Sequence, residues 1–272
     1  MIDIHTHILP NIDDGATNIE ETFNLLKEAK KVGFEAVVLT SHYRKGYYET
    51  DTPEREVWVN AIYENLKAKN IDINLYLGNE IYLSDEMIKY MEDGKASTIN
   101  DTSYVLFEMP LYEEPENLYE MVNQMQQYKI VPILAHPERY EFIQNDPDLI
   151  YDLIEKGVLM QADYGSIIGQ YGEKTKIMVR KLFENNMIHM LGSNVHRQET
   201  VYPRISQCIK KIKEIVGEEM LEKLTTTNPK LVLNNKKIEI DKPYRIEYTF
   251  KDKFNFITGG KLNKIFNIFI TK

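Results

Sequence analysis

The chain has 272 residues, 43% of them hydrophobic and 28% charged, which fits one large domain or two smaller ones. Its net charge of −9 argues against a general nucleic-acid-binding protein, and its single cysteine excludes an internal disulfide framework. No apolar run could span a bilayer, and nothing at the N-terminus resembles a signal peptide, so we expect a cytoplasmic protein.

Predicted strands and helices alternate along most of the chain. We predict strands over the first residues and over 35–40, 73–77, 104–107, 130–135, 158–161 and 187–191. We predict helices over 17–33, 53–69, 84–93, 116–129, 147–156, 173–186 and 203–216, with shorter pieces to about 234. Seven strands alternating with helices indicate an α/β fold with a parallel sheet and right-handed crossovers.

Polar residues fall at or just past the carboxyl ends of these strands. In a strand, His5 and His7 point to the same side, because side chains alternate. The set comprises His5, His7, His42, Glu80, Glu108, His136, Asn194 and His196. Carboxyl ends meet on one face of a β/α-barrel, where active sites are built. An open doubly wound sheet would gather only some of them, so we favour a closed barrel.

The residue types indicate metal chemistry. Five histidines and two glutamates, together with Asp13 or Asp14, are more ligands than one ion can use. Two or three zinc, iron or manganese ions would absorb them. Adjacent divalent ions activate water and stabilise a transferring phosphoryl group, so hydrolysis of a phosphate ester is the expected reaction.

These motifs resemble a known superfamily. They are His5-Thr-His7, the His42 position, Glu80, His136-Pro-Glu-Arg-Tyr140 and Gly192-Ser-x-x-His196, and they resemble the polymerase-and-histidinol-phosphatase (PHP) superfamily. Within it, His-Ile-Leu-Pro-x-x-Asp-Asp-Gly and Gly78-Asn-Glu80-Ile most resemble the manganese-dependent protein-tyrosine phosphatases of bacterial capsule and exopolysaccharide clusters. The resemblance implies a distorted seven-stranded β/α-barrel over residues 1–240 and leaves 241–272 as a C-terminal tail.

The resemblance also implies a ligand set. His5, His7 and Glu80 would hold a first ion, and Glu80, Glu108 and His136 a second. Asp14, or less readily Asp13, would hold a third with His42 and His196. The family has an aspartate where this chain has Asn194, whose amide oxygen can coordinate a cation but brings no charge.

Several side chains are candidates for contact with the substrate. We expect Arg139, Glu108 and His42 to act in catalysis, and Arg139 and Arg44 to bind phosphate, since a guanidinium can bind two phosphate oxygens. Arg197 is a weaker candidate. Tyrosines near 43–48 and Tyr112 could line a pocket for a phenyl ring, although each is as readily explained by packing or solvent contact.

Three features have simpler explanations. His189 is expected to be a core histidine, and Cys208 a packing residue, because the arginine of a thiolate loop is absent. Residues 242–272 carry a charge of +5 among aromatic residues. This tail could contact an anionic membrane surface or an acidic partner, or simply finish the domain as a strand or hairpin.

The expected function is metal-dependent hydrolysis of phosphotyrosine in proteins, with Mn²⁺ as the favoured ion and Fe or Zn as alternatives. The resemblance implies a bacterial tyrosine kinase as substrate, and direct attack by water without a covalent enzyme intermediate. One alternative is a small-molecule phosphatase such as histidinol phosphatase. Another is a protein that binds the kinase but is a weak catalyst, because Asn194 replaces an aspartate. A membrane-docking adaptor would rest only on the tail. The sequence leaves the oligomeric state open.

Overall fold

The computed structural model describes residues 1–249, 252, 256 and 258. Its strands are β1 (Ile2–Thr6), β2 (Ala36–Leu39), β3 (His42–Tyr43), β4 (Asn74–Leu77), β5 (Glu80–Tyr82), β6 (Tyr104–Glu108), β7 (Val131–Ala135), β8 (Leu159–Asp163) and β9 (Met190–Gly192). Its α-helices are α1 (Ile19–Lys31), α2 (Thr52–Leu66), α3 (Met87–Glu92), α4 (Leu118–Gln127), α5 (Glu141–Asn145), α6 (Asp148–Glu155), α7 (Glu173–Glu184), α8 (Ile205–Glu222) and α9 (Asn228–Leu233). Short turns of other helix types are η1 (Ile99–Asp101), η2 (Pro137–Arg139), η3 (Tyr164–Ile168), η4 (Tyr202–Arg204) and η5 (Lys223–Thr227).

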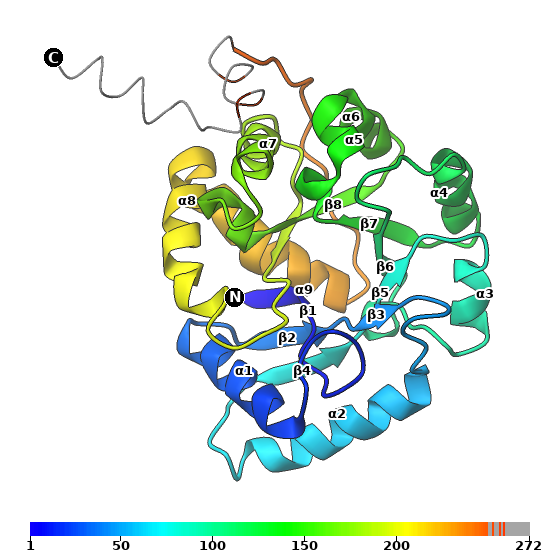
Figure 1. Cartoon of the computed structure of the whole chain (residues 1–272), viewed down its shortest axis with the longest axis vertical. Helices are drawn as coiled ribbons and strands as arrows, with labels where there is room; N and C mark the ends of the chain where they lie inside the picture. The colour runs from blue at the N-terminus through cyan, green and yellow to red at the C-terminus, as the bar shows by residue number, and fades with distance from the viewer. Residues whose placement is uncertain (250–251, 253–255, 257, 259–272) are drawn as a thin grey trace, which may run out of the picture.

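Parallel strands form the centre of the molecule, and helices surround them (Figure 1). The strands pair in the orders β1-β2-β4 and β3-β5-β6-β7-β8-β9, and every pairing within these sheets is parallel. The α/β class predicted from the sequence is therefore confirmed. The strands form two hydrogen-bonded parallel sheets that curl into a half-barrel, so the closed barrel is not confirmed.

The predicted number of seven strands is not confirmed. The described residues contain nine strands, because the second and third predicted strands are each followed by a short separate strand. At these breaks, hydrogen bonds from side chains take the place of some backbone hydrogen bonds between neighbouring strands. Asn79 Nδ2 donates to Ser41 O at 2.7 Å, and Thr40 Oγ1 accepts from Thr6 N at 2.9 Å. The breaks shift the chain from one sheet to the other and bring His42 opposite Glu80 in β3 and β5.

The first strand also contacts the segment that follows the last one. Asn194 N donates to His5 O, and His7 N donates to Val195 O, both at 2.9 Å. These backbone hydrogen bonds hold the end of β1 beside residues 194–195. Polar residues that follow the first and the last strand of the chain therefore lie close together.

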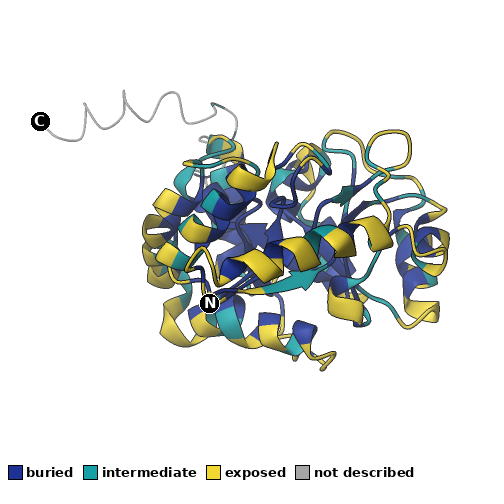
Figure 2. Cartoon of the chain, turned by 90° about the horizontal axis from the view of Figure 1, so that it is seen from below, coloured by how far each residue is buried: buried dark blue, intermediate teal, exposed yellow. Residues whose placement is uncertain are grey.

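Alternation along the strands divides the core into two parts. The larger hydrophobic cluster includes Val37 of β2 and Phe107 of β6 and packs against the surrounding helices. A smaller cluster includes Val38 and Leu106, their sequence neighbours, together with Val232 of α9. Most strands are buried and are dark blue behind the exposed helices in Figure 2, whereas β4 is only partly buried.

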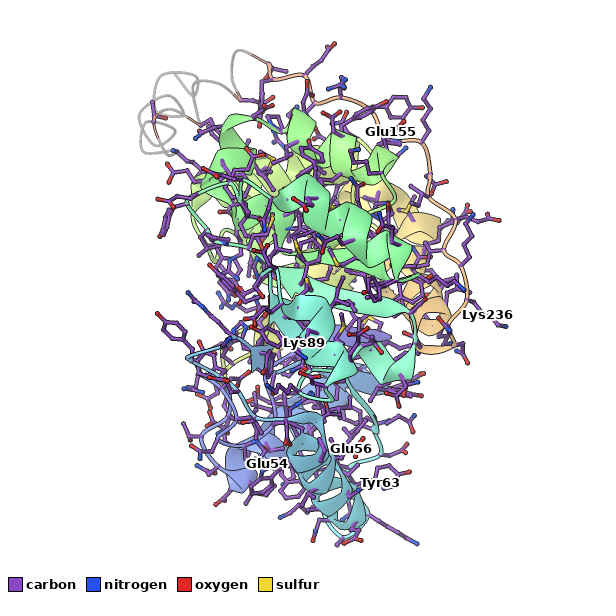
Figure 3. The ribbon with its side chains drawn as sticks, turned by 90° about the vertical axis from the view of Figure 1, so that its right-hand side faces the viewer. Glu54, Glu56, Tyr63, Lys89, Glu155 and Lys236 are labelled. Atoms are coloured by element: carbon purple, nitrogen blue, oxygen red, sulfur yellow. The ribbon has the colours of Figure 1, made fainter. Side chains whose placement is uncertain are left out.

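The helices have sequence signals that match their positions. Asn18 caps α1, where its Oδ1 accepts from Glu20 N and Glu21 N at 3.0 Å. Acidic residues in the first turn and lysines in the last complement the helix dipole. Many outward-facing side chains are charged, as the exposed Glu54, Glu56 and Lys89 illustrate in Figure 3, although α2 also exposes Val57 and Tyr63.

The predicted division into a domain of 1–240 and a tail of 241–272 is only partly within the described residues. The beginning of the tail packs against the domain. Arg245 Nη1 lies 2.7 Å from Asp148 Oδ2, and Tyr244 N donates to Asn185 O at 3.0 Å. The hairpin expected around residues 259–260 lies outside the described residues.

Among the described residues, no helix combines the length and the apolar character needed to cross a bilayer.

Candidate metal centre

The polar residues predicted from strand ends converge on one cluster at the carboxyl side of the sheet. His5 lies in β1 and His7 follows it, His42 and Glu80 begin β3 and β5, and Glu108 ends β6. His136 follows β7, and Asn194 and His196 follow β9. Two of these residues have left-handed backbones, with φ of 36° at His136 and 51° at Asn194. Asparagine tolerates this conformation, and other asparagines of the chain adopt it, whereas it is less common for histidine.

Three donor atoms form the deepest part of the cluster. His5 Nε2 lies 3.0 Å from both His7 Nε2 and Glu80 Oε2, and His7 Nε2 lies 3.2 Å from the same oxygen. All three residues are fully buried.

The rear nitrogens of both histidines face oxygen atoms. His5 Nδ1 lies 2.7 Å from Gln161 Oε1, and His7 Nδ1 lies 2.7 Å from Asp13 Oδ2. These oxygens accept, so each Nδ1 carries a hydrogen and each Nε2 is the ring atom that can bind a proton or a metal ion.

A second group of donors is closer to solvent. His7, Asp14, His42 and His196 each offer an atom within 4.8 Å of the others, and so do His42, Glu80 and Glu108. His42 Nδ1 lies 3.1 Å from Glu108 Oε1 and 3.2 Å from Glu80 Oε2 without hydrogen-bond geometry to either.

The geometry separates the two adjacent aspartates. Asp14 Oδ1 lies 3.3 Å from His196 Nε2 and 3.6 Å from His42 Nε2, so its carboxylate faces the cluster. Asp13 lies behind it, because its oxygens accept from Gly15 N and His42 N and contact the rear of His7. Gly15 is required in this loop, since a Cβ there would lie 2.1 Å from His7 O.

The grouping differs in part from the set implied by the family resemblance. The first group, His5 with His7 and Glu80, is the same. His42, not His136, joins Glu80 and Glu108. His136 Nε2 instead lies 3.0 Å from the other oxygen of Glu80, while its Nδ1 is buried without a hydrogen-bond partner.

The electrostatics of the cluster favour cations. Burial alone would lower the pKa of His5, but the Glu80 carboxylate outweighs this effect and raises that pKa to about 9. Burial and the neighbouring carboxylates oppose each other in the same way at His42, where the pKa rises to about 10. Burial would raise the pKa of Glu80, but the surrounding histidines lower it well below its ordinary value. Burial and the neighbouring histidines lower the pKa of His7. The negative charge that retains protons on His5 and His42 would also hold divalent cations.

The donor set and its spacing fit divalent metal ions. Two ligands at right angles on bonds of about 2.1 Å lie about 3.0 Å apart, which matches the spacing of the deep donors. Mixed imidazole and carboxylate ligands suit zinc, iron and manganese. The residues present therefore fit the metal group that the sequence predicted.

The predicted phosphate-binding arginines lie in different settings. Arg139 Nη1 contacts Asp163 Oδ2 at 3.4 Å, and its guanidinium lies 4.4 Å from the centre of the Tyr171 ring. Arg44 lies between the rings of Tyr47 and Tyr82, with centroid distances of 4.2 and 4.1 Å.

The tyrosines near 43–48 and Tyr112 also differ in setting. Tyr43 is buried in the core, while Tyr47 is exposed and the Tyr48 ring stacks on His42. Tyr112 is 76% exposed, and Arg197 is exposed.

The two residues assigned to packing lie in the core. His189 is buried, and its Nδ1 accepts from Met160 N at 3.0 Å. Cys208 is buried within α8. The core positions predicted for both residues are confirmed, although His189 lies just before β9 and its Nε2 has no hydrogen-bond partner among the described residues.

The sequence interpretation missed the support behind the cluster. Asp163 ends β8 and is buried beside Asn194 and Arg139. Glu138, also buried, accepts from Asp163 N at 2.9 Å, and burial followed by the Asp163 charge raises its pKa to about 8. A polar residue at the end of a strand was the signal, and the predicted strand stopped two residues before Asp163.

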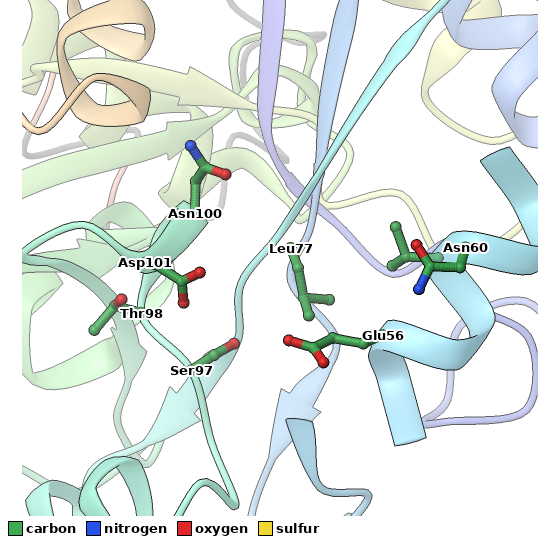
Figure 4. A pocket seen from close by; sticks show the side chains of 8 residues that line it. Glu56, Asn60, Leu77, Ser97, Thr98, Asn100 and Asp101 are labelled. Carbon is green, nitrogen blue, oxygen red and sulfur yellow. The ribbon is translucent and has the colours of Figure 1, made fainter. Parts of the chain in front are cut away.

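A separate hollow of about 240 Å³ lies beside α2 and η1 (Figure 4). It is lined by Glu56, Val59, Asn60, Leu77, Ser97, Thr98, Asn100 and Asp101. None of the cluster residues lines it, so it is not an entrance to the candidate metal centre.

The fold and the cluster together define a class of protein: a parallel α/β fold with a histidine and carboxylate centre at the carboxyl ends of its strands. The chain belongs to the family described as capsular polysaccharide synthesis, CpsB/CapC, whose model matches residues 1–234. The resemblance seen in the sequence is therefore confirmed.

Relatives from several bacteria support this assignment. The CapC protein of Staphylococcus aureus is 31% identical over 94% of this chain and all of its own length. Tyrosine-protein phosphatase YwqE of Bacillus subtilis is 30% identical over 88% of this chain and 93% of its own.

A solved structure agrees with the sequence relatives. It comes from a study of YwqE from Bacillus subtilis and CpsB from Streptococcus pneumoniae, described as unique metal-dependent tyrosine phosphatases. It is similar to this chain with a TM-score of 0.86 and 29% identity, and covers 91% of this chain and all of its own.

Proposed function

We propose that this chain is a metal-dependent protein-tyrosine phosphatase whose centre is the histidine and carboxylate cluster. This is the activity predicted from the sequence, and the named relatives bear it out at the level of the family. The observation that carries the proposal is the convergence of His5 Nε2, His7 Nε2 and Glu80 Oε2 within 3.0 to 3.2 Å.

The ligand assignment follows the geometry. His5, His7 and Glu80 would hold one ion, assisted by Asn194. Asp14, His42 and His196 would hold another, and Glu108 and His136 would complete the group around Glu80. We propose Mn²⁺ as the ion. Bound divalent ions supply activated water and neutralise negative charge on a phosphoryl group.

The chain's own residues would bind and orient the substrate. Arg139 uses one N–H on Asp163, so its other N–H groups can bind phosphoryl oxygens. Arg44, Tyr47 and Tyr48 lie along the segment that follows His42, where the aromatic ring of a phosphotyrosine would contact them. His42 Nδ1 lies within 3.2 Å of the carboxylates of Glu80 and Glu108, so these residues could act together at the cluster.

We propose a bacterial tyrosine kinase of capsule or exopolysaccharide synthesis as the substrate, because the family description names capsular polysaccharide synthesis. The cytoplasmic location remains a prediction, as does contact of the tail with a membrane surface.

The test is phosphate release by the full chain with added Mn²⁺ and with a chelator. The substrates are a phosphotyrosyl peptide, the matched phosphoseryl peptide and histidinol phosphate. The proposal expects metal-dependent release from the phosphotyrosyl peptide above all. Faster release from histidinol phosphate would favour a small-molecule phosphatase.

Asn194 motivates one further candidate, a weakly catalytic protein that binds the kinase. Tight binding of the phosphopeptide with no turnover at saturating Mn²⁺ would favour that function instead.

A further inference from the structure

A buried carboxylate behind the cluster has no part in the ligand set described so far. Asp163 is 1% exposed and has two oxygens with separate roles. Its Oδ1 accepts from Gln161 Nε2 at 3.2 Å, and its Oδ2 accepts from Asn194 Nδ2 at 3.0 Å and from Arg139 Nη1 at 3.4 Å. A carboxylate can only accept, so it determines which end of each neighbouring amide faces it.

The first oxygen controls His5 through Gln161. Because Gln161 presents its NH₂ group to Asp163, its Oε1 must face the other way, and it lies 2.7 Å from His5 Nδ1. That oxygen accepts the Nδ1 hydrogen, so the Nε2 lone pair of His5 faces the cluster. Gly192 leaves the space for this contact, since a Cβ there would lie 2.5 Å from His5 Cβ and 2.8 Å from Gln161 Nε2.

The second oxygen controls Asn194. Because the NH₂ group of Asn194 donates a hydrogen bond to Asp163, its Oδ1 must point away from that carboxylate. This oxygen is buried and has no hydrogen-bond partner among the described residues. A buried amide oxygen without a donor is costly unless a ligand uses it. The Asn194 backbone is tied to His5, whose carbonyl accepts from Asn194 N at 2.9 Å.

We propose that Asp163 is a positioning residue for metal binding, which holds His5 in its ligating tautomer through Gln161 and directs the Asn194 carbonyl oxygen to the cation. Asp163 also places a negative charge directly behind the neutral Asn194. The inference rests on the proposed metal centre and adds to it a residue that does not itself bind the ion.

The charge and the amide can be exchanged between the two positions. Asp163→Asn leaves one acceptor oxygen for two amides, so either Gln161 or Asn194 must turn. In the double variant Asp163→Asn/Asn194→Asp, the new asparagine can accept from Gln161 and donate to the new aspartate. The links to Gln161 and to residue 194 are then restored, with the carboxylate on the cluster side, and only the longer contact with Arg139 Nη1 is lost.

The experiment is calorimetric titration of Mn²⁺ into the metal-free full chain, with the thermal unfolding temperature measured for each variant. The control is Asp72→Asn, which removes an exposed carboxylate paired with Lys30. We expect Asp163→Asn to weaken the tightest Mn²⁺ site about 10- to 100-fold, as loss of an outer hydrogen-bond partner does at other metal sites. The Mn²⁺ affinity of the double variant should lie within about threefold of that of the unmodified chain. The control variant should bind Mn²⁺ as tightly as the unmodified chain.

Two results would overturn the inference. One is unchanged Mn²⁺ affinity in Asp163→Asn. The other is failure of the double variant to regain affinity, including failure because it does not fold, since the exchange is expected to preserve the hydrogen bonds to Gln161 and to residue 194. The titration measures Mn²⁺ binding and not phosphate release. If the unmodified chain binds Mn²⁺ but releases no phosphate in the separate activity assay, the phosphatase proposal is refuted and this inference is not.

Discussion

The two halves of the cluster differ in how far water reaches them. In the deep half, the side chains of His5, His7 and Glu80 are at most 1% exposed, and Gln161 and Asp13 hold the histidines from behind. In the open half, the exposed fractions are 14% for His42, 16% for Glu108, 27% for His196 and 53% for Asp14. The deep half is suited to fixing cations, while the open half is where a substrate can enter.

The largest effect is expected in the deep half. Glu80→Gln removes the carboxylate that lies within 3.2 Å of His5, His7 and His42 and of His136 through its second oxygen. We expect phosphate release from a phosphotyrosyl peptide to fall more than about 1,000-fold, and Mn²⁺ content measured by elemental analysis to fall with it. Circular dichroism serves as the control for folding. Full activity in this variant would mean that Glu80 is not a ligand.

In the open half, we expect a loss of function without a loss of stability. Asp14→Asn should reduce phosphate release about 10- to 100-fold, while the free energy of unfolding changes by less than about 0.5 kcal/mol, because the side chain is half-exposed. Asp13→Asn is the matched variant. Since Asp13 is buried against His7 and His42 N, it should lower the unfolding temperature as well. Equal losses of stability in the two variants would contradict the claim that the open half can be changed without destabilising the fold.

A smaller effect is expected at the rim. Arg44→Ala removes the guanidinium held between Tyr47 and Tyr82, so KM for the phosphotyrosyl peptide should rise about 5- to 10-fold with kcat within about twofold. Lys89→Ala, which removes an exposed lysine paired with Asp93, is the control and should change neither constant. A fall in kcat alone would instead place Arg44 at the reacting phosphate.

The last effect concerns stability alone and involves the one histidine outside the cluster. Burial holds the pKa of His189 at about 4, below its ordinary value of 6.5. Between those pH values the unfolded chain binds a proton that the folded chain does not, so this histidine lowers stability as pH falls and has no effect above pH 6.5. At pH 5 the cost is about 2 kcal/mol.

Urea unfolding of the metal-free chain and of His189→Gln at pH 7.5 and pH 5 measures this effect. The variant should lose less stability on acidification than the unmodified chain. Identical losses would show that His189 does not titrate in this way.

Periodicity and strand ends predicted much of this molecule. The alternation of elements gave the parallel α/β class, and one rule, polar residues after strands, found the histidines and glutamates that converge. The rule failed at Asp163 because the predicted strand ended at 161, whereas β8 continues to 163. The sequence also could not reveal β3 and β5, since strands of two and three residues have no detectable period and are defined by tertiary pairing.

The orientation of side-chain amides was equally inaccessible from sequence. Asn194 could be recognised as a neutral residue in a ligand position, but the carboxylate behind it lies 31 residues away in the chain. Only the folded structure shows that Asp163 faces the nitrogen of Asn194 and leaves its oxygen free of protein partners.

The most direct measurement is a crystal structure of the full chain grown with Mn²⁺, with anomalous diffraction recorded at the manganese edge. The account predicts one anomalous peak among His5, His7 and Glu80, and another among Asp14, His42 and His196. Manganese bound elsewhere on the protein, with no peak within the cluster, would contradict it.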